Sequence, residues 1–113
     1  MSDFAFLYRG RDNNASPEQM QKTFEKWRTW MKELGASGHL KEVGHPLEGS
    51  GKVVRGNQKA ITDGPFAEAK DVVCGFTLVQ ARNIEEATEL SKGCPILEIG
   101  GTVEVRPIQA LNM

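Results

Sequence analysis

Asp63 and Arg106 are the two side chains whose positions in the sequence best suit them to chemistry. Asp63 stands where the expected strand KAIT meets Gly64 and Pro65, and a side chain at a strand end beside such residues can be held rigidly at a pocket rim. A carboxylate there can act as a general base or anchor a substrate. It can equally cap the turn by accepting backbone N–H groups, so both roles stay open.

Arg106 lies in the apolar segment near the end of the chain, two residues after Glu104. Residues two apart on a strand share a face, so both charges should point to one side, with Val103 and Val105 on the other. A guanidinium is always charged and needs a partner when it is buried. That partner is Asp63, Glu104 or an anionic ligand, and a purely structural ion pair is the alternative to ligand binding.

His39 and His45 are the two histidines, and imidazole has the unperturbed pKa best suited to proton transfer near neutral pH. On a straight strand their separation spans about 20 Å, which is too far for one shared metal ion. No compact ligand cluster accompanies them, so no metal site is predicted. His45, between Gly44 and Pro46, is the better acid–base candidate, and an exposed loop histidine is the alternative.

The residues after Gly64 add a ring and a positive charge. Phe66 is the aromatic residue predicted to lie at the pocket, and Lys70 adds a cation close to the helical turn that Pro65 can begin. The free N–H groups of such a turn, with a cation nearby, favour a carboxylate, enolate or phosphate ligand. An ordinary capped turn is the alternative.

The composition is that of a globular protein. Its 113 residues fit a single domain, 1–113, with 39% hydrophobic and 26% charged residues. Fourteen Lys and Arg against fifteen Asp and Glu, interspersed along the chain, argue against nucleic acid as a partner. The first apolar stretch, residues 4–8, fits neither a signal peptide nor a membrane span. Two cysteines without a CxxC spacing suit a reducing compartment, and we expect a cytoplasmic protein without a cofactor.

Periodicity and capping residues predict the elements. Residues 3–9 are apolar on both faces of a strand, which indicates a strand in the middle of a sheet. Ser16, Pro17 and Gln19 predict a helix start, and Gly35 its end. The stripe of this helix that should enter the core is formed by Met20, Phe24, Trp27, Met31 and Leu34, with Trp30 on its flank.

The rest of the chain predicts one broken strand, a hairpin, two further strands and a second helix. The broken strand covers 38–47, the hairpin combines VVRG with KAITDG, and the later strands are GFTLVQA and 102–108. Asn83 caps the second helix, whose Ile84, Ala87 and Leu90 should point inward and which should stop at Gly93. This order predicts an α+β, ferredoxin-like antiparallel sheet with two helices on one face. A second copy would cover the other face, so we expect a homodimer.

Three segments resemble the DGPF branch of the YCII-related family: TDGPFAEAKDVVCGFTLVQA, NIEEATELSKGCP and GGTVEVRPI. Their ordered residues include Asp63 to Phe66, Glu68, Lys70, Gly75 and Glu104 to Pro107. The resemblance implies a dimeric α+β barrel in which two ferredoxin-like subunits enclose a pocket bordered by the DGPF loop. It implies no single activity.

Three functions therefore stay open. The first is a cofactor-free enzyme that acts on an oxygenated or aromatic anionic metabolite by acid–base chemistry. The second is a non-catalytic ligand-binding or regulatory module, and the third a purely structural dimer. The wider family carries a histidine near its first helix, paired with a downstream aspartate. Here residues 17–34 contain no histidine, which argues against a His–Asp mechanism.

Overall fold

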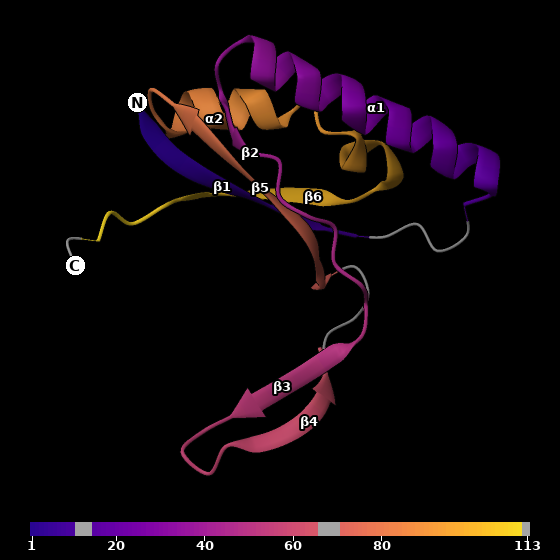
Figure 1. Cartoon of the computed structure of the whole chain (residues 1–113), viewed down its shortest axis with the longest axis vertical. Coiled ribbons are helices and arrows are strands. Elements are labelled where there is room, and N and C mark those ends of the chain that lie inside the picture. The colour runs from indigo at the N-terminus through magenta and orange to yellow at the C-terminus, as the bar shows by residue number, and fades with distance from the viewer. Residues whose placement is uncertain (11–14, 66–70, 112–113) are drawn as a thin grey trace.

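The computed structural model describes residues 1–10, 15–65 and 71–111. Four of its strands form one antiparallel sheet in the order β2–β5–β1–β6 (Figure 1). These strands are β1 (Ser2–Arg9), β2 (Leu40–Glu42), β5 (Val73–Ala81) and β6 (Thr102–Pro107). A separate hairpin consists of β3 (Gly51–Arg55) and β4 (Ala60–Gly64). Phe66, Lys70 and most of the helical turn predicted after Pro65 lie outside the described residues.

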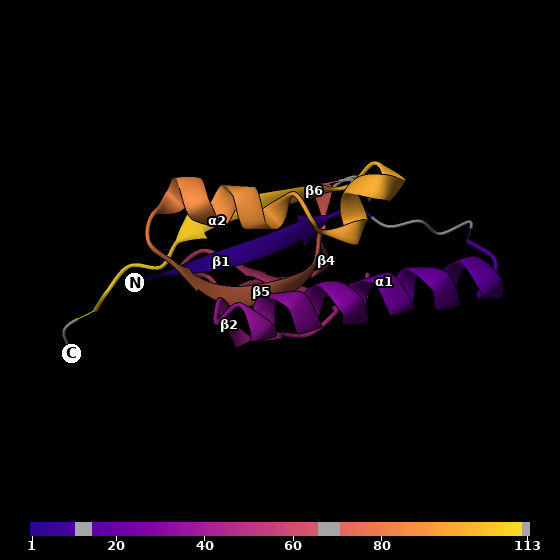
Figure 2. The ribbon, with the colours of Figure 1, turned by 90° about the horizontal axis from the view of Figure 1, so that it is seen from above.

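Two helices, α1 (Pro17–Ala36) and α2 (Ile84–Ser91), lie on one face of the sheet (Figure 2). With the hairpin set aside, the element order is β1, α1, β2, β5, α2, β6, which is the predicted ferredoxin-like arrangement. The central position predicted for residues 3–9 is confirmed, because β1 lies between β5 and β6. A 3₁₀ helix over Pro95–Ile99, which the sequence patterns did not predict, precedes β6.

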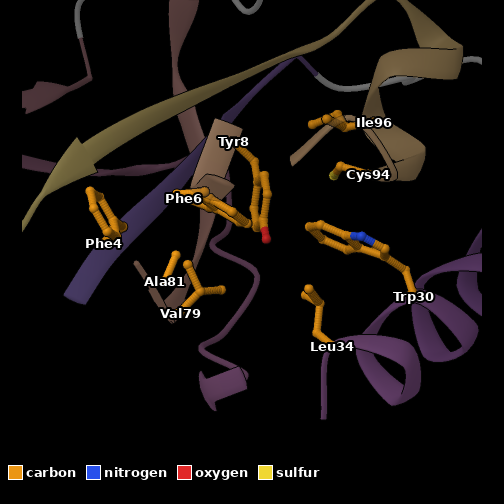
Figure 3. Packing of buried hydrophobic residues seen from close by; sticks show 10 residues of the cluster. Phe4, Phe6, Tyr8, Trp30, Leu34, Val79, Ala81, Cys94 and Ile96 are labelled. Carbon is orange, nitrogen blue, oxygen red and sulfur yellow. The ribbon is translucent and has the colours of Figure 1, made fainter. Parts of the chain in front are cut away.

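The core lies between the sheet and the helices. Phe6 is fully buried, and Trp30 of α1 stacks against it with ring centroids 6.0 Å apart (Figure 3). Tyr8 packs edge-on against Trp27 at 4.9 Å. The buried members of this cluster are Phe4, Phe6, Tyr8, Trp30, Leu34, Val79, Ala81, Ala87, Cys94 and Ile96.

Capping residues explain where α1 begins and ends. The Ser16 hydroxyl accepts from the Gln19 N–H at 3.2 Å and Gln19 Oε1 accepts from the Ser16 N–H at 2.9 Å, which confirms the capping box. The helix ends at Ala36, one residue after the predicted end at Gly35. The glycine that adopts the left-handed conformation after the helix is Gly38, at φ +80°. The N–H groups of Gly38 and His39 bond to the carbonyls of Gly35 and Leu34, as in a Schellman motif.

The predicted core stripe of α1 is wrong in its first half. Met20 and Phe24 are exposed, whereas Leu34 is buried and Trp30, predicted on the flank, is buried too. The physical reason is reach, because the first turns of α1 extend beyond the sheet, where no described strand lies beneath them (Figure 2). Ile84 is likewise exposed at the first position of α2, while Ala87 is buried as predicted.

A buried hydroxyl chain fastens the segment after β2 to the sheet. Tyr8 donates to Thr77 Oγ1 at 2.7 Å, and Thr77 donates to the carbonyl of Val43 at 2.8 Å. Gly44 follows with φ +77°, and its Cα approaches the backbone of Phe76 so closely that a Cβ would lie 1.8 Å from the Phe76 carbonyl oxygen. The predicted strand over 38–47 therefore shortens to three residues, and Pro46 continues it only as a bridge to Gly75.

No helix within the described ranges combines the length and the apolar character that crossing a membrane requires.

Candidate binding face of the sheet

The face of the sheet opposite the helices has an apolar centre. The register pairs Leu7 with Phe76 and Ala5 with Leu78, and side chains on paired residues point to the same side. Ala5 and Leu7 alternate on β1 with Phe4, Phe6 and Tyr8, and Phe76 and Leu78 alternate on β5 with Thr77 and Val79. The residues between them face the helices and are buried. All four paired residues are half-buried, and both helices lie on the other side of the sheet (Figure 1). We call this surface, formed by Ala5, Leu7, Phe76 and Leu78, the open face.

Two guanidinium groups and one carboxylate border the open face along β6. Glu104 pairs with Leu7 and Arg106 with Ala5 in the register, so both share the open face, as predicted. Val103 and Val105 pack against the core on the helix side. Arg106 Nη1 donates to Glu104 Oε2 at 3.2 Å, and Arg9 donates to Glu104 Oε1. Two positive charges therefore share one negative charge beside an apolar surface.

Arg9 is the residue of this cluster that sequence reasoning missed. Its place on the same side of the first strand as Leu7 was the available signal, because side chains alternate along a strand. Its side chain is 29% exposed, against 64% for Arg106. Arg9 Nε also donates to the carbonyl of Asp71 at 3.3 Å. Arg9 thus anchors Glu104, and the larger part of the Arg106 side chain faces solvent.

The hydrogen bond from Arg9 holds the pKa of Glu104 below its ordinary value of 4.5; burial acts in the opposite direction, and the hydrogen bond from Arg106 lowers the pKa further. A lowered folded-state pKa contributes stability that is present above the unfolded value and is lost as the pH falls through the folded value. We expect wild type to melt at a higher temperature than Glu104→Gln above about pH 5, with the difference vanishing in more acid solution. A difference in melting temperature that stays constant through the acid range would contradict this linkage.

Asp63 does not meet Arg106 within one chain. It lies on β4, its side chain is 85% exposed, and it forms an ion pair with Lys52 across the hairpin. Among the described residues, β4 makes no extensive contact with β6. Arg106 pairs instead with Glu104, one of the partners predicted for it. The backbone groups that Asp63 would cap belong to residues outside the described ranges.

The two histidines occupy different environments. The His45 ring packs edge-on against Phe76 with centroids 6.3 Å apart, which places it at the margin of the open face opposite β6. His39 is half-buried, and its Nδ1 lies 2.9 Å from the carbonyl of Gln80 and 3.9 Å from Glu86 Oε1, a structural setting. Over the described ranges, no three His, Cys, Asp or Glu side chains come together as a metal site.

Strand spacing gives the distance between the apolar centre of the open face and the charges at β6. Phe76, Leu7 and Glu104 lie in one row across β5, β1 and β6. Neighbouring strands are about 4.8 Å apart, so Phe76 and Glu104 are about 10 Å apart. This distance is comparable to the length of a single aromatic ring bearing a short acidic group.

Neither cysteine has the setting of a nucleophile. Burial raises the pKa of the Cys94 thiol to about 12, so it stays protonated and inert at neutral pH. Cys74 donates its S–H to the carbonyl of Gly10 at 3.3 Å.

Comparison with protein families agrees with the motifs and with the fold. A model of the YCII-related domain matches residues 3–112, which is nearly the whole chain. Comparison with curated proteins found no matching sequence. Because the family match spans every described element, from β1 to β6, this chain belongs to the YCII-related family.

Proposed function

We propose that this chain, a member of the DGPF branch, forms a cytoplasmic homodimer that binds a small anionic metabolite on the open face. The open faces of two copies turn toward each other and enclose the ligand, as in a dimeric α+β barrel. The ligand carries an aromatic or similarly flat apolar part and one carboxylate or enolate group. Phe66 and Lys70 stay predictions as further contacts of this ligand.

The single observation that carries the proposal is the pairing of an apolar surface with an excess of guanidinium. Ala5, Leu7, Phe76 and Leu78 offer ring-sized apolar contact, and among the described residues Glu104 is the carboxylate that pairs with both Arg9 and Arg106. An apolar surface alone would favour a purely structural dimer. A partly unbalanced cation beside it favours an anion, since enclosing a charge between subunits requires a partner for it.

Arg106 is the ligand anchor and Glu104 positions it. A guanidinium offers a planar fork that matches both oxygens of a carboxylate. Glu104 occupies one side of that fork through the 3.2 Å bond, and the larger part of the Arg106 side chain remains exposed. Arg9 is held by Glu104 and by the carbonyl of Asp71, and its positive charge adds to the attraction of the site for an anion.

The place of His45 supports a second candidate, proton transfer on the bound molecule. Its ring contacts Phe76, so it borders the same apolar centre that would hold the ligand. An imidazole can remove a proton next to a carbonyl whose developing negative charge faces a guanidinium. Exchange of the methylene protons of phenylpyruvate with deuterated water, followed by NMR, would show this activity. Enzyme-dependent exchange lost in His45→Gln supports it, and unchanged exchange removes His45 from the role.

The binding proposal is tested with two probes of similar shape and different charge. Benzoate is expected to raise the melting temperature of the wild-type dimer, whereas benzamide, which lacks the negative charge, has little effect. Arg106→Ala should weaken benzoate binding by about tenfold or more, the cost of losing a charge-assisted hydrogen bond. Arg82→Ala is the matched control, because Arg82 is exposed and pairs with Glu86 on α2. Equal benzoate binding in wild type and Arg106→Ala would remove Arg106 as the anchor.

A further inference from the structure

The β3–β4 hairpin stands away from the rest of the chain. The helices lie on one side of the sheet and the hairpin projects on the other (Figure 1). The radius of gyration is 15.7 Å, against about 13 Å for a compact domain of this length. Within the described ranges, β3 and β4 pack on each other and make no extensive contact with another element. Two-stranded hairpins are marginally stable in water, so this one needs a further surface to pack on.

One face of the hairpin is suited to an interface. Val54 pairs with Ile61 and Lys52 pairs with Asp63, so all four side chains point to the same side. Val54 is 62% exposed and Ile61 is 69% exposed. Two large β-branched side chains thus lie side by side in solvent, flanked by an exposed ion pair. We call the surface formed by Lys52, Val54, Ile61 and Asp63 the arm face.

The arm face and the open face are complementary. Each has an apolar part, and each has one exposed ion pair at its border: Lys52 with Asp63 on the arm, and Arg106 with Glu104 on the sheet. Bringing the two together allows the pairs to exchange, so that Asp63 meets Arg106 and Lys52 meets Glu104. Because Arg9 adds a second positive charge beside Glu104, a second carboxylate, that of Asp63, is favourable at the β6 border of the open face.

We propose that the hairpin is an arm that reaches a second copy of this chain, packs through its arm face beside the open face of that copy and places Asp63 next to Arg106 of the partner subunit. The inference rests on the proposed homodimer and adds a residue contributed in trans to its ligand site. Asp63 then closes the border of the pocket at β6, and the bound anion lies inside it. Each pocket contains side chains from both copies and is incomplete in one chain.

Charge reversal on each side of the contact tests the trans arrangement. In a twofold dimer, Asp63→Arg places like charges together at both contacts, and so does Arg106→Asp. Each variant alone should weaken dimerisation by about tenfold or more in sedimentation equilibrium. An equimolar mixture should form a heterodimer about as tightly as wild type, because each chain then supplies a partner of opposite charge at both contacts. The Asp63→Arg/Arg106→Asp double variant should recover as well.

The mixture separates contact between copies from contact within one copy. If dimerisation recovers in the double variant but not in the equimolar mixture of the two single variants, Asp63 meets Arg106 of its own chain. That result would overturn the proposal. The proposal would also be overturned if the Asp63→Arg variant dimerised as tightly as wild type. Lys26→Glu is the control, because Lys26 pairs with Glu98 on the helix side, and this reversal should leave dimerisation unchanged. Circular dichroism of each variant checks folding, which the high exposure of Asp63 should preserve.

The arm contact and the ligand site share Arg106, but the experiments distinguish the failure of one from the failure of the other. If Asp63→Arg dimerises normally and still binds benzoate, the arm contact is wrong and the proposed function stands. If the charge exchange behaves as expected while benzoate fails to bind wild type, the arm contact stands and the ligand site fails.

Discussion

Gly44→Ala is expected to lower the free energy of unfolding by about 3 kcal/mol or more, among the largest effects of any single substitution in this chain. Gly44 has φ +77°, where an L side chain is strained, and the added Cβ would lie 1.8 Å from the carbonyl oxygen of Phe76. That oxygen belongs to the backbone of β5, so it cannot move aside as the end of a flexible side chain can. The segment from Val43 to His45 would have to move away from β5 instead.

Gly38→Ala is the matched control for this prediction. Gly38 has a similar φ of +80°, but nothing lies within 4 Å of the point that a Cβ would occupy there. Its substitution should cost only the conformational strain, about 1–2 kcal/mol. Urea denaturation of both variants measures the difference between their losses of unfolding free energy. That difference reports the contact between residue 44 and the Phe76 backbone alone. Equal losses of stability would show that the segment after β2 does not rest on Phe76 as described.

Thr77→Val is expected to destabilise the protein by about 2 kcal/mol, although it hardly changes the volume of the side chain. Thr77 is fully buried, accepts from Tyr8 and donates to the carbonyl of Val43. Valine would leave the buried Tyr8 hydroxyl without its acceptor. Tyr8→Phe should cost only about 1 kcal/mol, because Thr77 keeps its bond to Val43.

The coupling between the two residues distinguishes this explanation from a general loss of packing. In the Tyr8→Phe background no hydroxyl is left unsatisfied, so Thr77→Val should cost less there than in wild type. Urea denaturation of the four proteins completes the double-mutant cycle. Additive effects would contradict a direct Tyr8–Thr77 hydrogen bond.

Local patterns predicted the elements that local physics determines. Ser16 and Gln19 are close in sequence, and their reciprocal bonds form as the capping box requires. The side that each residue of β6 faces followed from alternation, so the shared face of Glu104 and Arg106 was predictable before any tertiary contact was known. The α+β arrangement followed in turn from the order of these elements.

Features that depend on how far each element extends could not be predicted in this way. The apolar stripe from Met20 to Leu34 is regular. Its periodicity does not show that the sheet fails to reach Phe24, whose side chain is therefore exposed. The separation of Asp63 from Arg106 could not be predicted either, because it depends on the direction in which the hairpin points. A hairpin signal predicts the pairing of its two strands and gives no information on where the hairpin points. Its projection from the sheet separates two residues that the sequence motifs associate.

A crystal structure of the protein grown with benzoate tests the central claim most directly. The account predicts two copies with their open faces turned toward each other, and the benzoate ring on Leu7 and Phe76. Its carboxylate should lie within hydrogen-bonding distance of Arg106, about 2.7–2.9 Å for such a charge-assisted bond. An open face left in solvent, or one closed by a second copy with Arg106 bonded only to protein carboxylates and no benzoate, would contradict it.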